Sequence, residues 1–228
     1  LRNRRQRQMC IRDRSIACVQ VADTDAELGV ELPEKYSAGA QLTLGQFWKG
    51  VDALPAERAH AFVGASAAGL CFYVYLQDSD IGSRATADNQ KMWTLGDVAE
   101  FFIKPGGDRT DYWEIHITPN DFLMDIYIPN REVFTGGEIG WEDVVAPESH
   151  TRKRVGVGDG YWALEACIPW KAFRLSGIPD DGDIWRIAVC RYNYASGCDE
   201  PELSSTAALT QPGFHRHEES VSYTHLTL

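Results

Sequence analysis

Hydrophobic and polar residues alternate in short runs along most of the chain between positions 61 and 194. A period of two is typical of β-strands that bury one face. Turn sequences such as Gly-Gly-Asp, Asn-Asp and Asp-Gly separate the runs. The predicted strands are 61–65, 70–77, 98–105, 112–119, 122–129, 152–158, 161–169 and 184–194. Because no long helical pattern interrupts them, the sequence predicts an all-β fold, an antiparallel, jelly-roll-like β-sandwich with one or two short helical turns.

The same alternation predicts which side chains share a face of each strand. The side chains predicted to face the core are Trp113, Ile115, Ile117, Phe122, Met124, Ile126, Ile128, Trp162, Leu164, Ala166, Ile168, Trp185, Ile187 and Val189. Those predicted on the opposite faces include Glu100, Tyr112, Glu114, His116, Asp125, Glu165, Arg186 and Tyr192. One sheet is therefore expected to present a polar surface dotted with aromatic rings.

The two ends of the chain are related through the genetic code. One permitted codon choice for residues 6–14, read on the opposite strand, encodes Val-Ser-Tyr-Thr-His-Leu-Thr-Leu, which is the sequence of residues 221–228. This DNA element resembles the adapter that transposon-based sequencing libraries attach to both ends of a fragment. We therefore expect residues 1–14 and 221–228 to be adapter-encoded, and residues 15–220 to be a single domain truncated at both ends.

Excluding the first 14 residues changes the charge of the domain. The whole chain has 22 basic and 33 acidic residues and a net charge of −11. The N-terminal segment holds six of the arginines and one aspartate, so residues 15–220 carry 16 basic and 32 acidic residues and a net charge near −16. No basic patch remains to neutralise phosphates, which argues against nucleic-acid binding. No apolar run reaches membrane-spanning length, and the scattered cysteines have no metal-ligand spacing.

Five segments, taken in order, resemble family 9 carbohydrate-binding modules over about residues 40–220. They are Trp93-Thr-Leu-Gly-Asp97-Val-Ala-Glu100-Phe-Phe-Ile; Tyr112-Trp-Glu114-Ile-His-Ile-Thr-Pro-Asn followed by Asp125; the W-x-x-E-x-x-I-P-W segment from Trp162 to Trp170; Gly182-Asp-x-Trp185-Arg186 with Arg191 and Asn193; and Ser204-Ser205 with Gly213-Phe214-His215. The resemblance implies a sugar-binding β-sandwich, an accessory module of a secreted glycoside hydrolase or a stand-alone surface protein. An extracellular, surface or periplasmic location follows from the same resemblance.

Typed members of that family hold the end of a sugar chain between two tryptophan rings, with carboxylate, Arg and Asn side chains on the hydroxyl groups. Trp93 and Glu100 match the first ring and its acidic partner, while Trp141, Tyr192 and Tyr194 remain candidates for the second ring. The predicted carbohydrate-binding residues are therefore Trp93, Glu100, Asp125, Arg191, Asn193 and Tyr194. The family also holds structural calcium, for which Asp78 and Asp80 are the candidates, although calcium needs six to eight ligands.

Other functions remain open at this stage. Glu114, Glu165 and Arg186 are better interpreted as a structural network between strands. The sequence has no nucleophile elbow, phosphate loop or zinc-protease motif, and our hypothesis is that the domain binds sugar without catalysing a reaction. One alternative is a haem-binding sandwich of a redox protein, with Met92 or Met124 as an axial ligand. Another is a purely structural module of a larger surface hydrolase.

Overall fold

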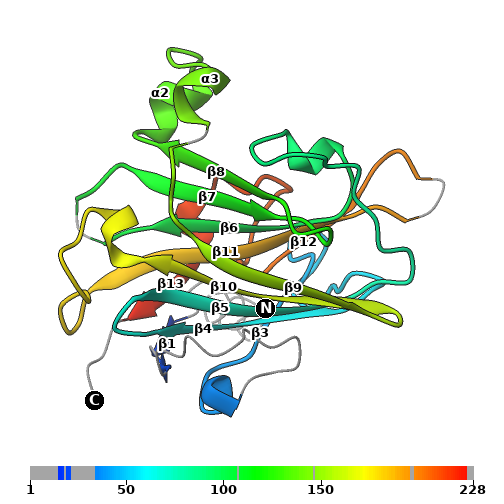
Figure 1. Ribbon diagram of the computed structural model, residues 1–228, viewed down its shortest axis with the longest axis horizontal. Coiled ribbons are helices and arrows are strands. Elements are labelled where there is room, and N and C mark those ends of the chain that lie inside the picture. The colour runs from blue at the N-terminus through cyan, green and yellow to red at the C-terminus, as the bar shows by residue number, and fades with distance from the viewer. Residues whose placement is uncertain are drawn as a thin grey trace, which may run out of the picture.

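The computed structural model describes residues 15–17, 19–21, 34–106, 108–145, 147–195 and 198–224. Within them the chain forms two β-sheets that pack face to face (Figure 1). Most neighbouring strands are antiparallel, and among the described strands only the β1–β13 and β2–β4 pairs are parallel. The predicted all-β sandwich is thereby confirmed.

In the part of the chain that the structure describes, one sheet has seven strands and the other has six. The seven-stranded sheet runs in the order β1 (Ser15–Ala17), β13 (Val221–Thr224), β11 (Ile184–Asn193), β6 (Val98–Lys104), β7 (Tyr112–Ile117) and β8 (Leu123–Ile128), with β12 (Glu202–Ser205) also paired to β11. The six-stranded sheet runs β2 (Val19–Gln20), β4 (Ala59–Ala65), β5 (Gly69–Gln77), β10 (Tyr161–Pro169) and β9 (Arg152–Gly158), with β3 (Leu42–Thr43) paired to β4. The eight predicted strands all occur, within two residues of their predicted ends.

The main core lies between the two sheets and contains the predicted inward faces of β6, β7, β10 and β11. Trp113, Trp162 and Trp185 are at most 5% exposed and belong to this cluster with the aliphatic residues of the same strand faces. Full burial of one such side chain stabilises the fold by roughly 1.5–3 kcal/mol. The alternation in these strands therefore predicted the core correctly.

The prediction for β8 was wrong. Met124, Ile126 and Ile128 pair with His116, Glu114 and Tyr112 of β7, so they point away from the main core. They belong to a second hydrophobic cluster, which covers the outer face of the seven-stranded sheet. Leu123 and Tyr127 point to the main core instead. Both faces of β8 are covered, so both carry apolar residues and the period of two does not distinguish them.

Several loops and short helices build that outer cover. The segment between β8 and β9 contributes α2 (Arg131–Thr135) and α3 (Trp141–Val144), and η2 (Met92–Thr94) adds Met92 to the same cluster. The described residues also form the 3-10 helices η1 (Glu34–Tyr36), η3 (Trp170–Phe173) and η4 (His217–Glu219). Tyr36 packs on the outer face of the six-stranded sheet, and η3 packs against the main core. Asn130 caps α2 by accepting hydrogen bonds from the N–H groups of Glu132 and Val133. The polar surface expected on this sheet is therefore not exposed, because Met92, Val144 and Phe214 pack over it.

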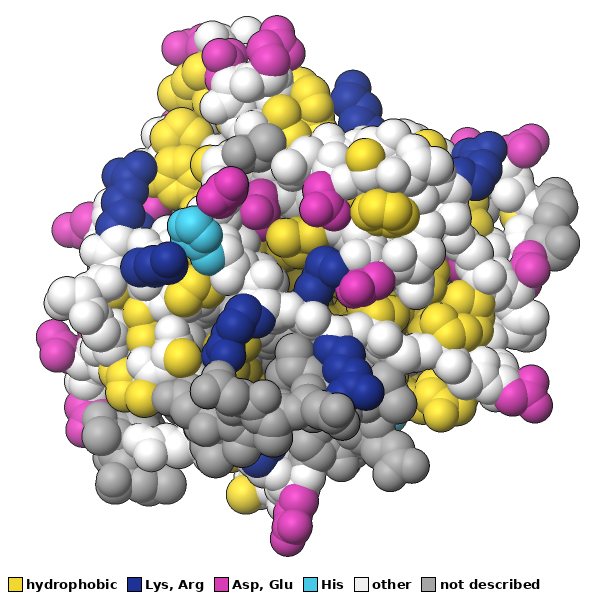
Figure 2. All heavy atoms as spheres, viewed as in Figure 1, with side chains coloured by type: hydrophobic (Ala, Val, Ile, Leu, Met, Phe, Trp, Pro, Cys, Tyr) yellow, Lys and Arg dark blue, Asp and Glu magenta, His cyan; other side chains and the backbone are white. Residues whose placement is uncertain are grey.

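The α2–α3 segment projects beyond β8 at the top of Figure 1. Acidic side chains gather at its tip in Figure 2, and the exposed ones from this segment are Glu132, Glu138, Glu142 and Asp143. None of the helices in the described ranges is long and apolar enough to cross a bilayer.

The described residues include only a part of the proposed adapter segments. Residues 1–14 and 225–228 lie outside the described residues. Residues 221–224 form β13, which pairs with β11 and β1 and buries Val221 and Tyr223 in the main core. The alternating Val-Ser-Tyr-Thr sequence is suited to this strand, because Val221 and Tyr223 lie on one face and point into the core. The backbone forms hydrogen bonds with the strands on both sides. The adapter origin of these residues stays a prediction.

Candidate functional site

An open hollow of about 900 Å³ lies where the loops after β5, before β6 and after β11 meet. It has the size of a small-molecule site. The described residues that line it are Asp80, Gly82, Ser83, Arg84, Trp93, Thr94, Leu95, Gly96, Tyr192, Tyr194, Ala195, Cys198, Asp199, Glu200, Pro201 and Leu203. Aromatic rings, three carboxylates and one guanidinium thus converge on one concave surface.

Trp93 stands at the edge of this hollow, in the short helix η2. Its side chain is partly buried. The ring contacts Trp141 with centroids 5.1 Å apart and His116 with centroids 5.5 Å apart, both edge to face. The Tyr194 hydroxyl donates a 2.6 Å hydrogen bond to the Trp93 carbonyl oxygen. Two of the predicted binding residues, Trp93 and Tyr194, therefore lie together at the hollow.

The second ring of a clamp is not Trp141 in this arrangement. Centroids 5.1 Å apart at 71° are in direct edge-to-face contact, so no sugar ring fits between Trp93 and Trp141. Tyr192 and Tyr194 both line the hollow. Tyr192 is held from behind by Phe214, with centroids 5.5 Å apart. Of the three candidates, these two tyrosines present rings to the space that Trp93 borders.

Asp97 ties two walls of the hollow together. It is fully buried, and its carboxylate accepts a 2.7 Å bond from the N–H of Gly82 and a 2.8 Å bond from the N–H of Tyr194. Burial raises the pKa of Asp97 to about 7, and the charge of Asp78 adds to the rise, while the two N–H groups oppose it. Asp97 is therefore a buried hydrogen-bond acceptor that joins two segments lining the hollow.

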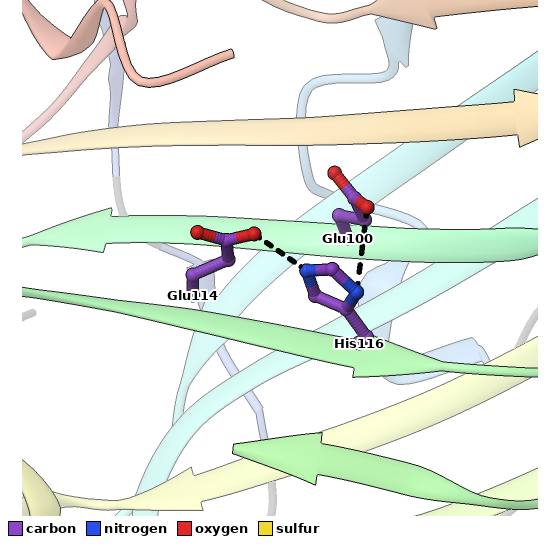
Figure 3. Close-up of side chains that lie close together, drawn as sticks. All are labelled: Glu100, Glu114 and His116. Atoms are coloured by element: carbon purple, nitrogen blue, oxygen red, sulfur yellow. Dashed lines mark hydrogen bonds and ion pairs between the residues drawn. The ribbon is translucent and has the colours of Figure 1, made fainter. Parts of the chain in front are cut away.

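Three titratable side chains meet on the outer face of the seven-stranded sheet (Figure 3), and one of them, His116, contacts the ring of Trp93. Glu100 of β6 lies opposite His116 of β7, and Glu114 is two residues from His116 on the same face. His116 Nε2 is 2.7 Å from Glu114 Oε1, and Nδ1 is 3.3 Å from Glu100 Oε1. Glu100 and His116 are at most 2% exposed. Burial, with the negative charge of Glu114, raises the pKa of Glu100 well above its ordinary value.

These three residues are also the one group in the described ranges whose ligand atoms lie close enough to hold a metal ion. The imidazole ring stands between the carboxylates and turns a different nitrogen to each (Figure 3). His116 Nε2 is hydrogen-bonded to Glu114, whereas the buried Nδ1 lies within ion-pair distance of Glu100 but makes no hydrogen bond. The three side chains form a buried acid–imidazole cluster, and its imidazole ring contacts Trp93.

Arg191 and Asn193 lie in a buried network between the two sheets. Arg191 donates to the Gln77 carbonyl at 2.7 Å, to Asp78 Oδ2 at 2.9 Å and to Asn193 Oδ1 at 2.6 Å. The Asn193 amide in turn donates to Glu57 at 2.8 Å. Arg191 and Asp78 are both about 1% exposed. Their hydrogen-bonding groups thus join the sheets beside the hollow, and a direct contact with sugar stays a prediction for both residues.

Asp78 and Asp80 do not fit a calcium ion as they are arranged. Asp78 shares one carboxylate oxygen with the guanidinium of Arg191 and accepts the N–H of Asp80 with the other. A guanidinium occupies the place where a cation would bind, and two carboxylates fall short of six ligands. Asp80 is exposed and turns to the hollow instead. Calcium binding therefore rests on the resemblance alone.

Asp125 is separated from the other predicted binding residues. It lies on the face of β8 opposite to Met124, and its carboxylate accepts hydrogen bonds from the backbone and hydroxyl of Ser149 at 3.0 and 2.7 Å. Burial raises its pKa. The strand pairing places it across from Ile115, on the side of β7 that faces the main core. The remaining predicted structural residues, Glu165 and Arg186, hydrogen-bond Tyr36 and Ser222.

Polar residues that the sequence analysis did not select complete the hollow. Arg84, Asp199 and Glu200 belong to loops whose meeting depends on long-range pairing, and no local pattern marks them. A second hollow of about 360 Å³ adjoins the first across residues 200–203. Trp48 and Lys49 line it, so an aromatic side chain borders each of the two hollows.

Solved structures with the same architecture include three that span nearly the whole chain. One is a Bacteroides uniformis protein whose proposed role is carbohydrate binding, with a TM-score of 0.70, 16% identity and coverage of 93% of this chain and 99% of that one. The other two are structures of a family 9 carbohydrate-binding module from Caldicellulosiruptor kristjanssonii. In complex with cellotriose it has a TM-score of 0.62, 11% identity and coverage of 93% and 94%. In complex with glucose it has a TM-score of 0.60, 11% identity and coverage of 92% and 96%.

Comparisons that use the amino-acid sequence find no relative. No family model matches this chain, and no curated protein matches it. At 11–16% identity, the likeness is one of architecture, carried over the full length of the compared domains. The chain therefore has the fold of the family 9 carbohydrate-binding modules.

Proposed function

We propose that this domain binds carbohydrate in the hollow bordered by Trp93. The observation that carries the proposal is the meeting of three aromatic rings with carboxylates and a guanidinium in one open hollow, at an end of the sandwich. The fold adds support, because a module of the same architecture has been solved with cellotriose and with glucose.

The chemistry of the lining suits a sugar. A pyranose has apolar C–H faces, which stack on flat rings such as those of Tyr192 and Trp93 at low entropic cost. Its equatorial hydroxyl groups both donate and accept hydrogen bonds. Asp80 and Glu200 would accept them, and Arg84 would donate to them. These groups are exposed, so a ligand reaches them without unfolding a loop.

In its wider setting the domain would serve a polysaccharide-degrading system without acting as a catalyst. It would hold a glycoside hydrolase, fused or neighbouring, on its substrate outside the cell. The family resemblance of the Trp93–Ile103 and Trp162–Trp170 segments supports this setting. Incubating the purified domain with a glycan panel tests the non-catalytic part, since released reducing sugar that disappears on mutating a glutamate would overturn it.

Titration with sugars tests the binding itself. Purified domain is titrated with glucose, cellotriose and a panel of other oligosaccharides, and tryptophan fluorescence and heat release are followed. A saturable change in both signals is expected for at least one sugar, because Trp93 borders the hollow. A protein that shows no response to any sugar would be a structural module, and a Soret band in its absorption spectrum would indicate haem instead. Met92 and Met124, the candidate axial ligands, are both fully buried in the second hydrophobic cluster.

A further inference from the structure

Two cysteines meet on the outer face of the six-stranded sheet, far from the hollow. Cys71 of β5 and Cys167 of β10 are directly paired across the two central strands. Their Sγ atoms are 2.7 Å apart, whereas Cys71 Sγ lies 3.7 Å from Ser66 Oγ. A disulfide bond measures about 2.05 Å. The two sulfur atoms are therefore closer to bonding distance than to an ordinary sulfur hydrogen bond.

The backbone already has the geometry that a disulfide requires. Directly opposed residues of an antiparallel pair have Cα atoms about 4.5–5.5 Å apart and project from the same face. Disulfides span Cα separations of about 4.4–6.8 Å. The strands are held in this register by eight further residue pairs, which extend from Tyr161–Gln77 to Pro169–Gly69. No backbone movement is needed to bring the cysteines together.

We propose that Cys71 and Cys167 form a cross-strand disulfide when the protein meets a small two-electron oxidant such as hydrogen peroxide. The thiolate of Cys167 attacks one peroxide oxygen, the O–O bond breaks, and a sulfenic acid and water are produced. Cys71 then attacks the Cys167 sulfur, the S–O bond breaks, and the oxygen leaves as a second water molecule. Two thiols and one peroxide thus yield one disulfide and two water molecules.

The groups around the two cysteines indicate which one attacks the oxidant and which one resolves the sulfenic acid. Cys71 donates its S–H to Cys167, and this bond lowers the pKa of Cys167 to about 7, with Arg152 on the neighbouring strand contributing in the same direction. The same bond, together with burial, raises the pKa of Cys71. Cys167 is therefore the nucleophile toward the oxidant, and Cys71 is the resolving thiol.

The other described cysteines provide the contrast. Cys190 is buried beside Ser205 Oγ at 3.2 Å, and Cys198 is exposed at the hollow. Both are free thiols in the structure. Among the cysteines of the described residues, only Cys71 and Cys167 face each other across a strand pair.

Mass spectrometry of a simplified variant tests the proposal. A protein with Cys10, Cys18 and Cys198 replaced by Ser keeps Cys71, Cys167 and Cys190. After reduction, peroxide treatment and quenching, it should lose the mass of two hydrogen atoms, and digestion should yield one peptide pair joined through Cys71 and Cys167. The oxidised form should melt on the order of 5–15 °C higher than the reduced form, because the bond closes a long loop.

Matched variants identify the pair. Cys190→Ser in the same background should still lose two hydrogen atoms, whereas Cys167→Ser should not. An unchanged mass, an added oxygen without a bridge, or a bridge that involves Cys190 would each overturn the proposal. Peptide mapping of the simplified variant decides this even when Cys167→Ser fails to fold.

Discussion

Replacing Trp93 by Ala should weaken sugar binding by a calculable amount. The side chain is only partly exposed, so about 60–80 Å² of a ring that covers 150–250 Å² on full burial is left for a ligand. At about 25 cal/mol per Å², losing this platform costs about 1.5–2 kcal/mol of binding free energy. The dissociation constant should therefore rise roughly 10- to 30-fold. The lost packing against Trp141 and His116 should lower the free energy of unfolding by about 1–2 kcal/mol, which leaves the domain folded.

The measurement is calorimetric titration with the tightest-binding sugar, alongside urea denaturation of each variant. Trp141→Ala is the matched control, since Trp141 touches Trp93 by an edge but does not line the hollow. It should cost similar stability and change the dissociation constant less than threefold. If folded Trp93→Ala binds within twofold of the parent protein, or if the two variants lose affinity equally, Trp93 is not the platform.

Three further changes have expected outcomes. Trp48→Ala should leave the affinity for glucose unchanged and reduce the affinity for oligosaccharides, because Trp48 borders only the adjoining hollow; titrations with sugars of increasing length measure this. Arg191→Met should cost about 3–5 kcal/mol of stability in urea denaturation, because it leaves Asp78 charged, buried and unpaired. Glu100→Gln should flatten the dependence of stability on pH. The folded pKa of Glu100 is raised, so it penalises the folded state progressively as the pH rises above about 4.3, the unfolded value.

Each of these changes has its own control. For Trp48, equal losses with glucose and with longer sugars would show a general effect on folding instead of a second subsite. Adding Asp78→Asn to Arg191→Met should restore part of the stability, and no recovery would mean that the lost charge pair is not the cause. For Glu100, the free energy of unfolding of the Glu100→Gln variant and of the parent protein is measured at pH 5 and at pH 8. An identical change between the two pH values in both proteins would refute a raised pKa of Glu100.

Periodicity predicted the sandwich well because most strands bury one face against the other sheet. Trp113, Trp162 and Trp185 show the same alternation in sequence and in space. It misplaced the face of β8, where Met124 packs under the outer cover and Asp125 lies on the side toward the other sheet. A strand covered on both faces offers no polar side for the pattern to reveal.

The candidate site was harder to predict than the fold. Trp93, selected through a motif resemblance, and Tyr194, a candidate second ring, both lie at the hollow, and their contact with sugar stays a prediction. Glu100 lies beneath the hollow, not in it, because loops cover the face on which alternation placed it. Arg84 and Glu200 come from loops that approach each other only when β5, β6 and β11 have formed. Contacts of this kind depend on long-range pairing, which no local sequence window contains.

The buried carboxylate of Asp97 has a consequence for how a ligand would be received. Its carboxylate accepts hydrogen bonds from the backbone N–H groups of Gly82 and Tyr194, which lie in two segments that line the hollow. We therefore expect the distance between these two segments to be the same with and without a ligand. A preorganised receptor loses little conformational entropy on association. Free and ligand-bound forms should then superimpose closely. The selectivity of the domain would depend on the fixed shape of the hollow, which would fit some sugar stereochemistries and exclude others by steric clash.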